Sequence, residues 1–161
     1  MPRLVVVLPL VPLPVGAGFP LRTWPLHVTV APTFVTDADT PAVAAAIAPV
    51  VADSPAMAVT AGDDEGFGPS GRVPVTVLAP SPELSALHGL LRDALRAVDA
   101  QFDDPAYTGA GYRAHVTHTR NARMQPGDIA LLEQAALVDM EPVGPQRWRQ
   151  VLWVSRFSIR G

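Results

Sequence analysis

The sequence predicts an α+β fold built mainly from antiparallel sheet. Short β-branched runs such as Leu4–Leu8 and Val73–Leu78 are mixed irregularly with two segments of helical periodicity. The chain has neither a glycine fingerprint of the βαβ type nor a strict alternation of strands and helices, so a parallel sheet is disfavoured. Its 161 residues, 48% of them apolar, are expected to form a single domain over residues 1–161.

The first half is expected to contain three strands and a helix. Leu4–Leu8 is an apolar run bounded by proline, the proline- and glycine-rich stretch Val11–Trp24 reads as a loop, and Leu26–Val30 resumes as a strand. Thr40 followed by proline is typical of a helix start, and apolar residues recur behind it at helical spacing until Pro49 ends or kinks the helix. The third strand is Ala56–Ala61.

The second half repeats these signals. It is expected to begin with an acidic, glycine-rich connection at Gly62–Gly71, the strand Val73–Leu78, and a leucine-striped helix capped by Ser81 and reaching about Asp99. A loop at Asp103–Gly111, the strand Tyr112–Thr119 and a short helix from Asp128 through Ala135 are expected next. The closing strands are Leu137–Met140 and Gln150–Ile159, separated by a turn near Gly144. The leucine-striped helix carries the clearest pattern of these.

The composition removes several classes of chemistry. All 12 basic residues are arginine, so a Schiff-base lysine is excluded, and the absence of cysteine excludes thiolate nucleophiles and cysteine-ligated zinc. A net charge of −3 argues against a protein that binds a long nucleic-acid duplex through electrostatic attraction. A small phosphate ligand, a nucleotide or an RNA terminus remains a fitting partner.

The chain gives no membrane signal. Met1–Gly18 superficially resembles a signal peptide, but Pro9, Pro12 and Pro14 interrupt its apolar run. No segment approaches the roughly 20 apolar residues that span a bilayer. We therefore expect a cytoplasmic protein without a membrane partner, and the sequence leaves its oligomeric state open.

The tripeptide His-Val-Thr occurs twice, at residues 27–29 and 115–117, each time on an expected strand. Alternation along a strand places His27 with Thr29 on one face, and His115 with Thr117 likewise. The chain has only four histidines, so this recurrence indicates an internal duplication. Two half-domains related by a pseudo-two-fold axis would bring the two strands to opposite walls of one groove.

Such a groove suits phosphodiester cleavage. In-line attack requires one group to take a proton from the nucleophile and another to give a proton to the leaving oxygen, and histidine does both near neutral pH. A threonine two residues along the strand can donate its hydroxyl to a phosphate oxygen. Neither step requires a metal or another cofactor.

The stretches LHVTVAP and YRAHVTHTR, about ninety residues apart, resemble the signatures of the 2H phosphoesterase superfamily, which includes proteins labelled 2′-5′ RNA ligase and cyclic phosphodiesterase. The resemblance implies two pseudo-symmetric lobes of mainly antiparallel sheet with outer helices around a central cleft. It also implies opening of 2′,3′-cyclic phosphates to 2′-phosphates, or reaction at 2′-5′ linkages. His27 and His115 match the catalytic positions, and Thr29 and Thr117 the phosphate-binding ones.

Further residues near the signatures are candidates for the substrate site. The resemblance places a basic group at Arg120, although strict alternation would turn it away from His115. Tyr112 and Trp24 could stack on a base or belong to the core, and Arg22, Arg113 and Arg123 could form a rim or be ordinary solvated arginines.

His88 is not expected to take part in the chemistry, and the role of His118 stays open. His118 lies three residues from His115 and so on the other strand face, which disfavours a shared metal, and His88 is expected to pack or cap a loop. Two alternatives to hydrolysis stay open: a non-catalytic module that binds nucleotides or RNA ends, and a 2′-5′ RNA ligase that runs the reverse reaction.

Overall fold

The computed structural model describes residues 2–104, 108–141 and 148–158. In chain order, its elements are β1 (Arg3–Pro9), β2 (Gly18–Pro20), the 3-10 turn η1 (Leu21–Thr23), β3 (His27–Val35), α1 (Thr40–Asp53), β4 (Met57–Phe67), β5 (Val73–Leu78), α2 (Pro82–Arg96), β6 (Gln101–Phe102), the 3-10 turn η3 (Gly109–Gly111), β7 (His115–Thr117), β8 (Ile129–Leu132), β9 (Gln134–Asp139) and β10 (Trp148–Arg156). The α+β prediction is confirmed.

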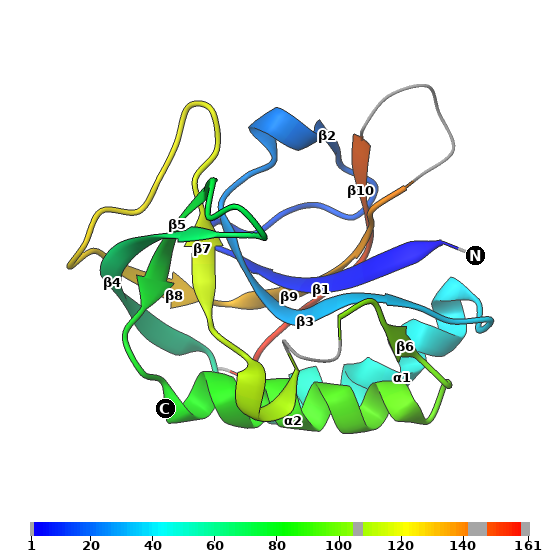
Figure 1. Ribbon diagram of the computed structural model, residues 1–161. Helices are drawn as coiled ribbons and strands as arrows, with labels where there is room; N and C mark the ends of the chain where they lie inside the picture. The colour runs from blue at the N-terminus through cyan, green and yellow to red at the C-terminus, as the bar shows by residue number, and fades with distance from the viewer. Residues whose placement is uncertain (1, 105–107, 142–147, 159–161) are drawn as a thin grey trace.

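The strands form one curled sheet of ten strands (Figure 1). Its main path runs β2-β10-β9-β1-β3-β7-β5-β4-β8, with β6 added beside β3, and all pairings between these strands are antiparallel. Both α-helices pack on the same face of this sheet (Figure 1). Neither helix in the described ranges is long and apolar enough to cross a membrane.

The strands β3 and β7 lie side by side at the middle of the sheet, and their buried face joins the main core. Val28 and Val116 are fully buried and pack in one cluster with the helix residues Ile47, Leu87 and Leu91. Because side chains alternate along a strand, the neighbours of these valines point to the face that the helices leave uncovered. The fold therefore turns both histidine-threonine pairs away from the core.

Several boundaries differ from the sequence expectations. The cap of α1 is Asp39, whose carboxylate accepts the N–H of Ala42 at 2.9 Å, and the helix continues past Pro49 to Asp53. The strand β3 continues through Pro32, where the register with β1 shifts and accommodates a residue without an N–H. The expected loop before Trp24 contains β2 and η1.

The expected helix from Asp128 through Ala135 is wrong, because this segment forms β8 and the start of β9. Leu132 pairs with Met57 of β4, and Ala135 pairs with Ser155 of β10. Likewise, β4 extends to Phe67 through most of the expected connection Gly62–Gly71. By contrast β5 has the predicted limits, and the Ser81 hydroxyl caps α2 by accepting the Leu84 N–H. The expected turn near Gly144 lies outside the described residues.

Candidate active site

The two His-Val-Thr tripeptides pair directly with each other. Val28 of β3 is the partner of Val116 in β7, and the strands are antiparallel. This register sets His27 opposite Thr117 and Thr29 opposite His115, so all four side chains share one face. The histidines are diagonal neighbours, whose Cα atoms in such a pair are about 7–8 Å apart. The strands are thus adjacent, closer than the opposite walls of a groove that duplication suggested.

Each histidine is held by a hydrogen bond to the backbone two residues earlier. Nδ1 of His27 lies 2.8 Å from the carbonyl oxygen of Pro25, and Nδ1 of His115 lies 2.8 Å from that of Arg113. A carbonyl oxygen only accepts, so Nδ1 carries the proton in both rings. No described residue hydrogen-bonds either Nε2. Each Nε2 therefore accepts a proton when the ring is neutral and donates one when it is charged.

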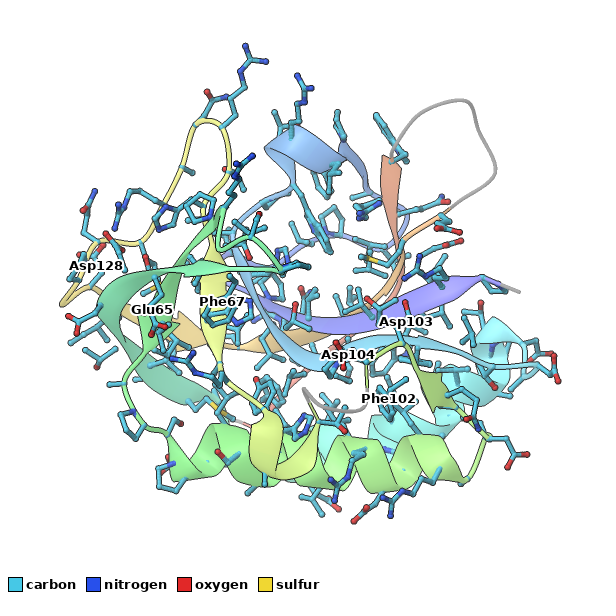
Figure 2. All side chains as sticks on the ribbon, viewed as in Figure 1. Glu65, Phe67, Phe102, Asp103, Asp104 and Asp128 are labelled. Atoms are coloured by element: carbon cyan, nitrogen blue, oxygen red, sulfur yellow. The ribbon has the colours of Figure 1, made fainter. Side chains whose placement is uncertain are left out.

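An aromatic ring supports each histidine, and an arginine covers each aromatic ring. Trp24 contacts His27 with ring centroids 3.9 Å apart, and the Arg149 guanidinium lies 5.5 Å from the Trp24 ring. Phe67, which reaches β7 from the end of β4 (Figure 2), lies 4.5 Å from the His115 ring. Arg113 in turn lies 5.1 Å from the Phe67 ring. The two halves of the site thus repeat the same sequence of groups.

Burial favours the neutral form of both imidazoles. Burial, together with the smaller effect of the positive charges of His115 and Arg149, lowers the pKa of His27 to about 4, against the opposing effect of the hydrogen bond to Pro25. Burial also lowers the pKa of His115, and the charge of Arg113 acts in the same direction. Both rings are therefore neutral near pH 7 in the free protein, with Nε2 able to accept a proton.

Two cavities meet over the four side chains. The first has a volume of about 630 Å³ and is lined by His27, Thr29 and Thr117 together with three arginines. The second has a volume of about 540 Å³ and is lined by His115, Phe67 and Tyr112. Both cavities share the lining residues Trp24, Thr29 and Met140, so they form neighbouring compartments of one cleft.

Tyr112 lines the His115 compartment, but its hydroxyl and its ring both contact other residues of the protein. Its hydroxyl donates to the backbone carbonyl of Thr29 at 2.8 Å, and its ring stacks on His88 with an interplanar angle of 4°. His88 is anchored by Val30 and Gly109, which fits the expected structural role. Trp24 likewise packs within the protein, since its side chain is only 7% exposed and its ring contacts His27. Both aromatics therefore position β3 and its histidine.

Arg120 reaches the cleft because β7 ends early. The strand stops at Thr117, so the alternation that would turn Arg120 away does not apply, and this residue lines the His27 compartment. Arg22 and Arg149 line the same compartment, the second of them from β10. Sequence reasoning did not identify Arg149 or Phe67 as parts of the site, since only tertiary packing brings these distant residues beside the histidines and Trp24.

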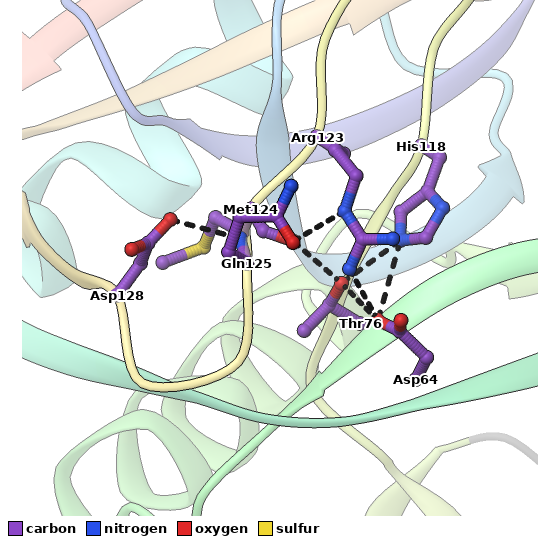
Figure 3. Close-up of polar contacts among 7 residues, drawn as sticks. All are labelled: Asp64, Thr76, His118, Arg123, Met124, Gln125 and Asp128. Atoms are coloured by element: carbon purple, nitrogen blue, oxygen red, sulfur yellow. Dashed lines mark hydrogen bonds and ion pairs between the residues drawn. The ribbon is translucent and has the colours of Figure 1, made fainter.

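His118 follows the end of β7 and lines the His27 compartment, but its ring is held in a polar network of its own (Figure 3). Its Nε2 lies 2.8 Å from the Thr76 hydroxyl, which also contacts Asp64 and the Met124 carbonyl. Arg123 pairs with Asp64 at 2.6 Å, so it joins this network and does not line either compartment. Within the described ranges, no cluster of three or more metal-binding side chains occurs.

A family model of the 2′-5′ RNA ligase superfamily matches residues 18–148, which include both tripeptides. The chain belongs to this superfamily. The resemblance to 2H phosphoesterases is thereby confirmed. No curated protein sequence matches the chain significantly.

Solved structures agree on the fold of this superfamily member. A crystal structure titled as a phosphoesterase has a TM-score of 0.65 at 17% identity over 98% of both chains. Escherichia coli LigT in complex with 3′-AMP has a TM-score of 0.63 at 18% identity over 98% of both. TT0787 of Thermus thermophilus has a TM-score of 0.60 at 17% identity over 96% of this chain and 97% of its own. LigT has also been crystallised with ATP, NADP+ and phosphate.

Proposed function

We propose that the protein is a metal-independent phosphodiesterase that opens 2′,3′-cyclic phosphates to 2′-phosphates or cleaves 2′-5′ linkages of RNA or nucleotides. His27 and His115 act as general acid and base. The observation that carries the proposal is the shared face of two imidazoles, each with Nδ1 held by a carbonyl and Nε2 left for chemistry. Membership of the superfamily and the nucleotide complexes of LigT support the substrate class.

The proposed reaction balances with these groups alone. One neutral imidazole takes a proton from water at Nε2, the water oxygen attacks phosphorus, and the bond from phosphorus to the 3′ oxygen breaks. The second imidazole, protonated at Nε2, gives its proton to that oxygen, which leaves a 2′-phosphate and a 3′-hydroxyl. The hydroxyls of Thr29 and Thr117 donate to the non-bridging oxygens, on which negative charge accumulates. Ligation uses the same groups in reverse.

The proposal predicts turnover without metal. Purified protein should open a nucleoside 2′,3′-cyclic phosphate, or cleave a 2′-5′ dinucleotide, at the same rate with and without EDTA, because the proton transfers and charge contacts come from side chains. Product analysis by chromatography should find the 2′-phosphate. Calorimetric binding of a nucleoside 2′-phosphate with no turnover of either substrate would reject the enzyme and favour a binding module.

The pH dependence should report both histidines. The active form has one neutral and one protonated imidazole, and in the free enzyme it is most populated between their two pKa values. Since burial lowers the pKa of His27 to about 4 and also lowers that of His115 from 6.5, kcat/KM should pass through a maximum below pH 6.5. The cyclic diester keeps a single negative charge over this range. Titration of the substrate therefore does not change the shape of the pH profile.

The control for this profile is the folded state at each pH. Unfolded His27 binds its proton at a higher pH than folded His27, so folding stability falls as the pH drops from about 6.5 towards 4. Circular dichroism should therefore accompany every rate measurement. A profile of the folded enzyme with both limbs above pH 6.5 would contradict the burial of these rings.

A further inference from the structure

The His27 compartment carries an unusual concentration of positive charge. Arg22 of η1, Arg120 of the loop after β7 and Arg149 of β10 all line it, and no aspartate or glutamate occurs among its described lining residues. This happens in a chain whose net charge is −3. Three guanidinium groups from distant segments therefore face one space beside the site of the scissile phosphate.

Two of these arginines have no acidic partner among the residues that the structure describes. Neither Arg22 nor Arg120 forms an ion pair with a described residue, although Arg3, Arg92, Arg96, Arg113 and Arg123 all do. A backbone hydrogen bond from the Arg120 N–H to the Arg22 carbonyl, 3.3 Å long, ties their segments together. Since like charges brought together repel, an anion between them would stabilise this arrangement.

The other compartment lacks this excess. Arg113 is the one arginine among its described lining residues and is paired with Glu65 at 2.7 Å, and Asp104 also lines the compartment (Figure 2). The cleft is therefore electrostatically asymmetric along its length, although the four central side chains are symmetric. An anionic group attached to the substrate is favoured on the His27 side, and a neutral group such as a base fits better on the His115 side.

We infer that the part of the His27 compartment lined by Arg22, Arg120 and Arg149 is a second phosphate subsite, which binds a phosphate carried by the same nucleoside as the scissile one. Such a group is the 5′-phosphate of a nucleoside cyclic phosphate or the preceding diester of an RNA end. The inference rests on the proposed function for the placement of the first phosphate over the two tripeptides. Arg120 and Arg22 are then contacts of this second phosphate, which explains why neither forms an ion pair with a described residue.

Three substrates test the subsite kinetically: a nucleoside 2′,3′-cyclic phosphate with a free 5′-hydroxyl, the same compound with a 5′-phosphate, and a dinucleotide ending in a cyclic phosphate. The last two should have kcat/KM values about tenfold or more above the first, because charge-assisted hydrogen bonds to phosphate form only with them. Whichever of the two gains more identifies a terminal or an internal phosphate. Equal values for all three would overturn the subsite.

Variants assign the effect to the arginines. Arg22→Gln should reduce the preference for the phosphorylated substrates about three- to tenfold, and Arg22→Glu should abolish it, since exposed charge pairs contribute modestly and a reversed charge repels. Arg96→Gln is the matched control, because it removes the same charge from an exposed position on α2 outside both compartments. A preference that survives in Arg22→Glu would contradict the assignment.

A binding measurement separates this inference from catalysis. The affinity of a nucleoside 2′,5′-bisphosphate should exceed that of the 2′-monophosphate about tenfold, measured by calorimetry at low ionic strength, and Arg22→Gln should narrow the difference. This result would support the subsite even if no substrate were turned over. Equal affinities, or no binding of either compound, would overturn it.

Discussion

Replacing either His27 or His115 with alanine is expected to lower kcat/KM for cyclic-phosphate opening by about 10²- to 10⁴-fold while leaving the fold intact. Each substitution removes one of the two Nε2 atoms that transfer protons, and the buried face of the strands, formed by Val28 and Val116, is untouched. The two losses should be similar, because both rings are held by the same bond to the backbone.

The double variant sharpens this test. Since the histidines act as a pair, removing both should cost much less than the product of the single losses. His118→Gln is the matched control: the Nε2 of His118 is already hydrogen-bonded to the Thr76 hydroxyl, and an amide preserves that hydrogen bond. We expect its activity within tenfold of wild type. Wild-type activity in the double alanine variant, at unchanged melting temperature, would reject histidine catalysis.

Local signals explain which parts of the fold could be read from the sequence. The leucine stripe and serine cap of α2 lie within one segment, and the β-branched run of β5 does as well, so both were predicted with few errors. The segment from Asp128 through Ala135 has residues that favour a helix, yet it pairs with β4 and β10. Tertiary pairing overrode the local preference there.

The same distinction applies to the site. Alternation along a strand was enough to predict that His27 and Thr29 share a face, and likewise His115 and Thr117. The direct pairing of Val28 with Val116 depends on the register of two strands nearly ninety residues apart, which no local pattern encodes. The contacts of Trp24 with Arg149 and of Phe67 with His115 are tertiary in the same sense.

Replacing Thr29 or Thr117 with valine is expected to lower kcat by about 10²- to 10³-fold, the loss typical of one donor to the developing charge. Valine keeps the shape and strand preference of threonine and removes only the hydroxyl, which hydrogen-bonds no described residue in the free protein.

Serine at either position should restore most of the activity, since it returns the donor without the methyl group. Thr60→Val is the matched control, because Thr60 is an exposed strand residue of β4 that lines neither compartment. The register places each threonine opposite the histidine of the other strand, so the two valine variants should lose similar amounts. Valine variants as active as the control would show that other donors bind the phosphate. The arginines of the His27 compartment would then be the groups to replace next.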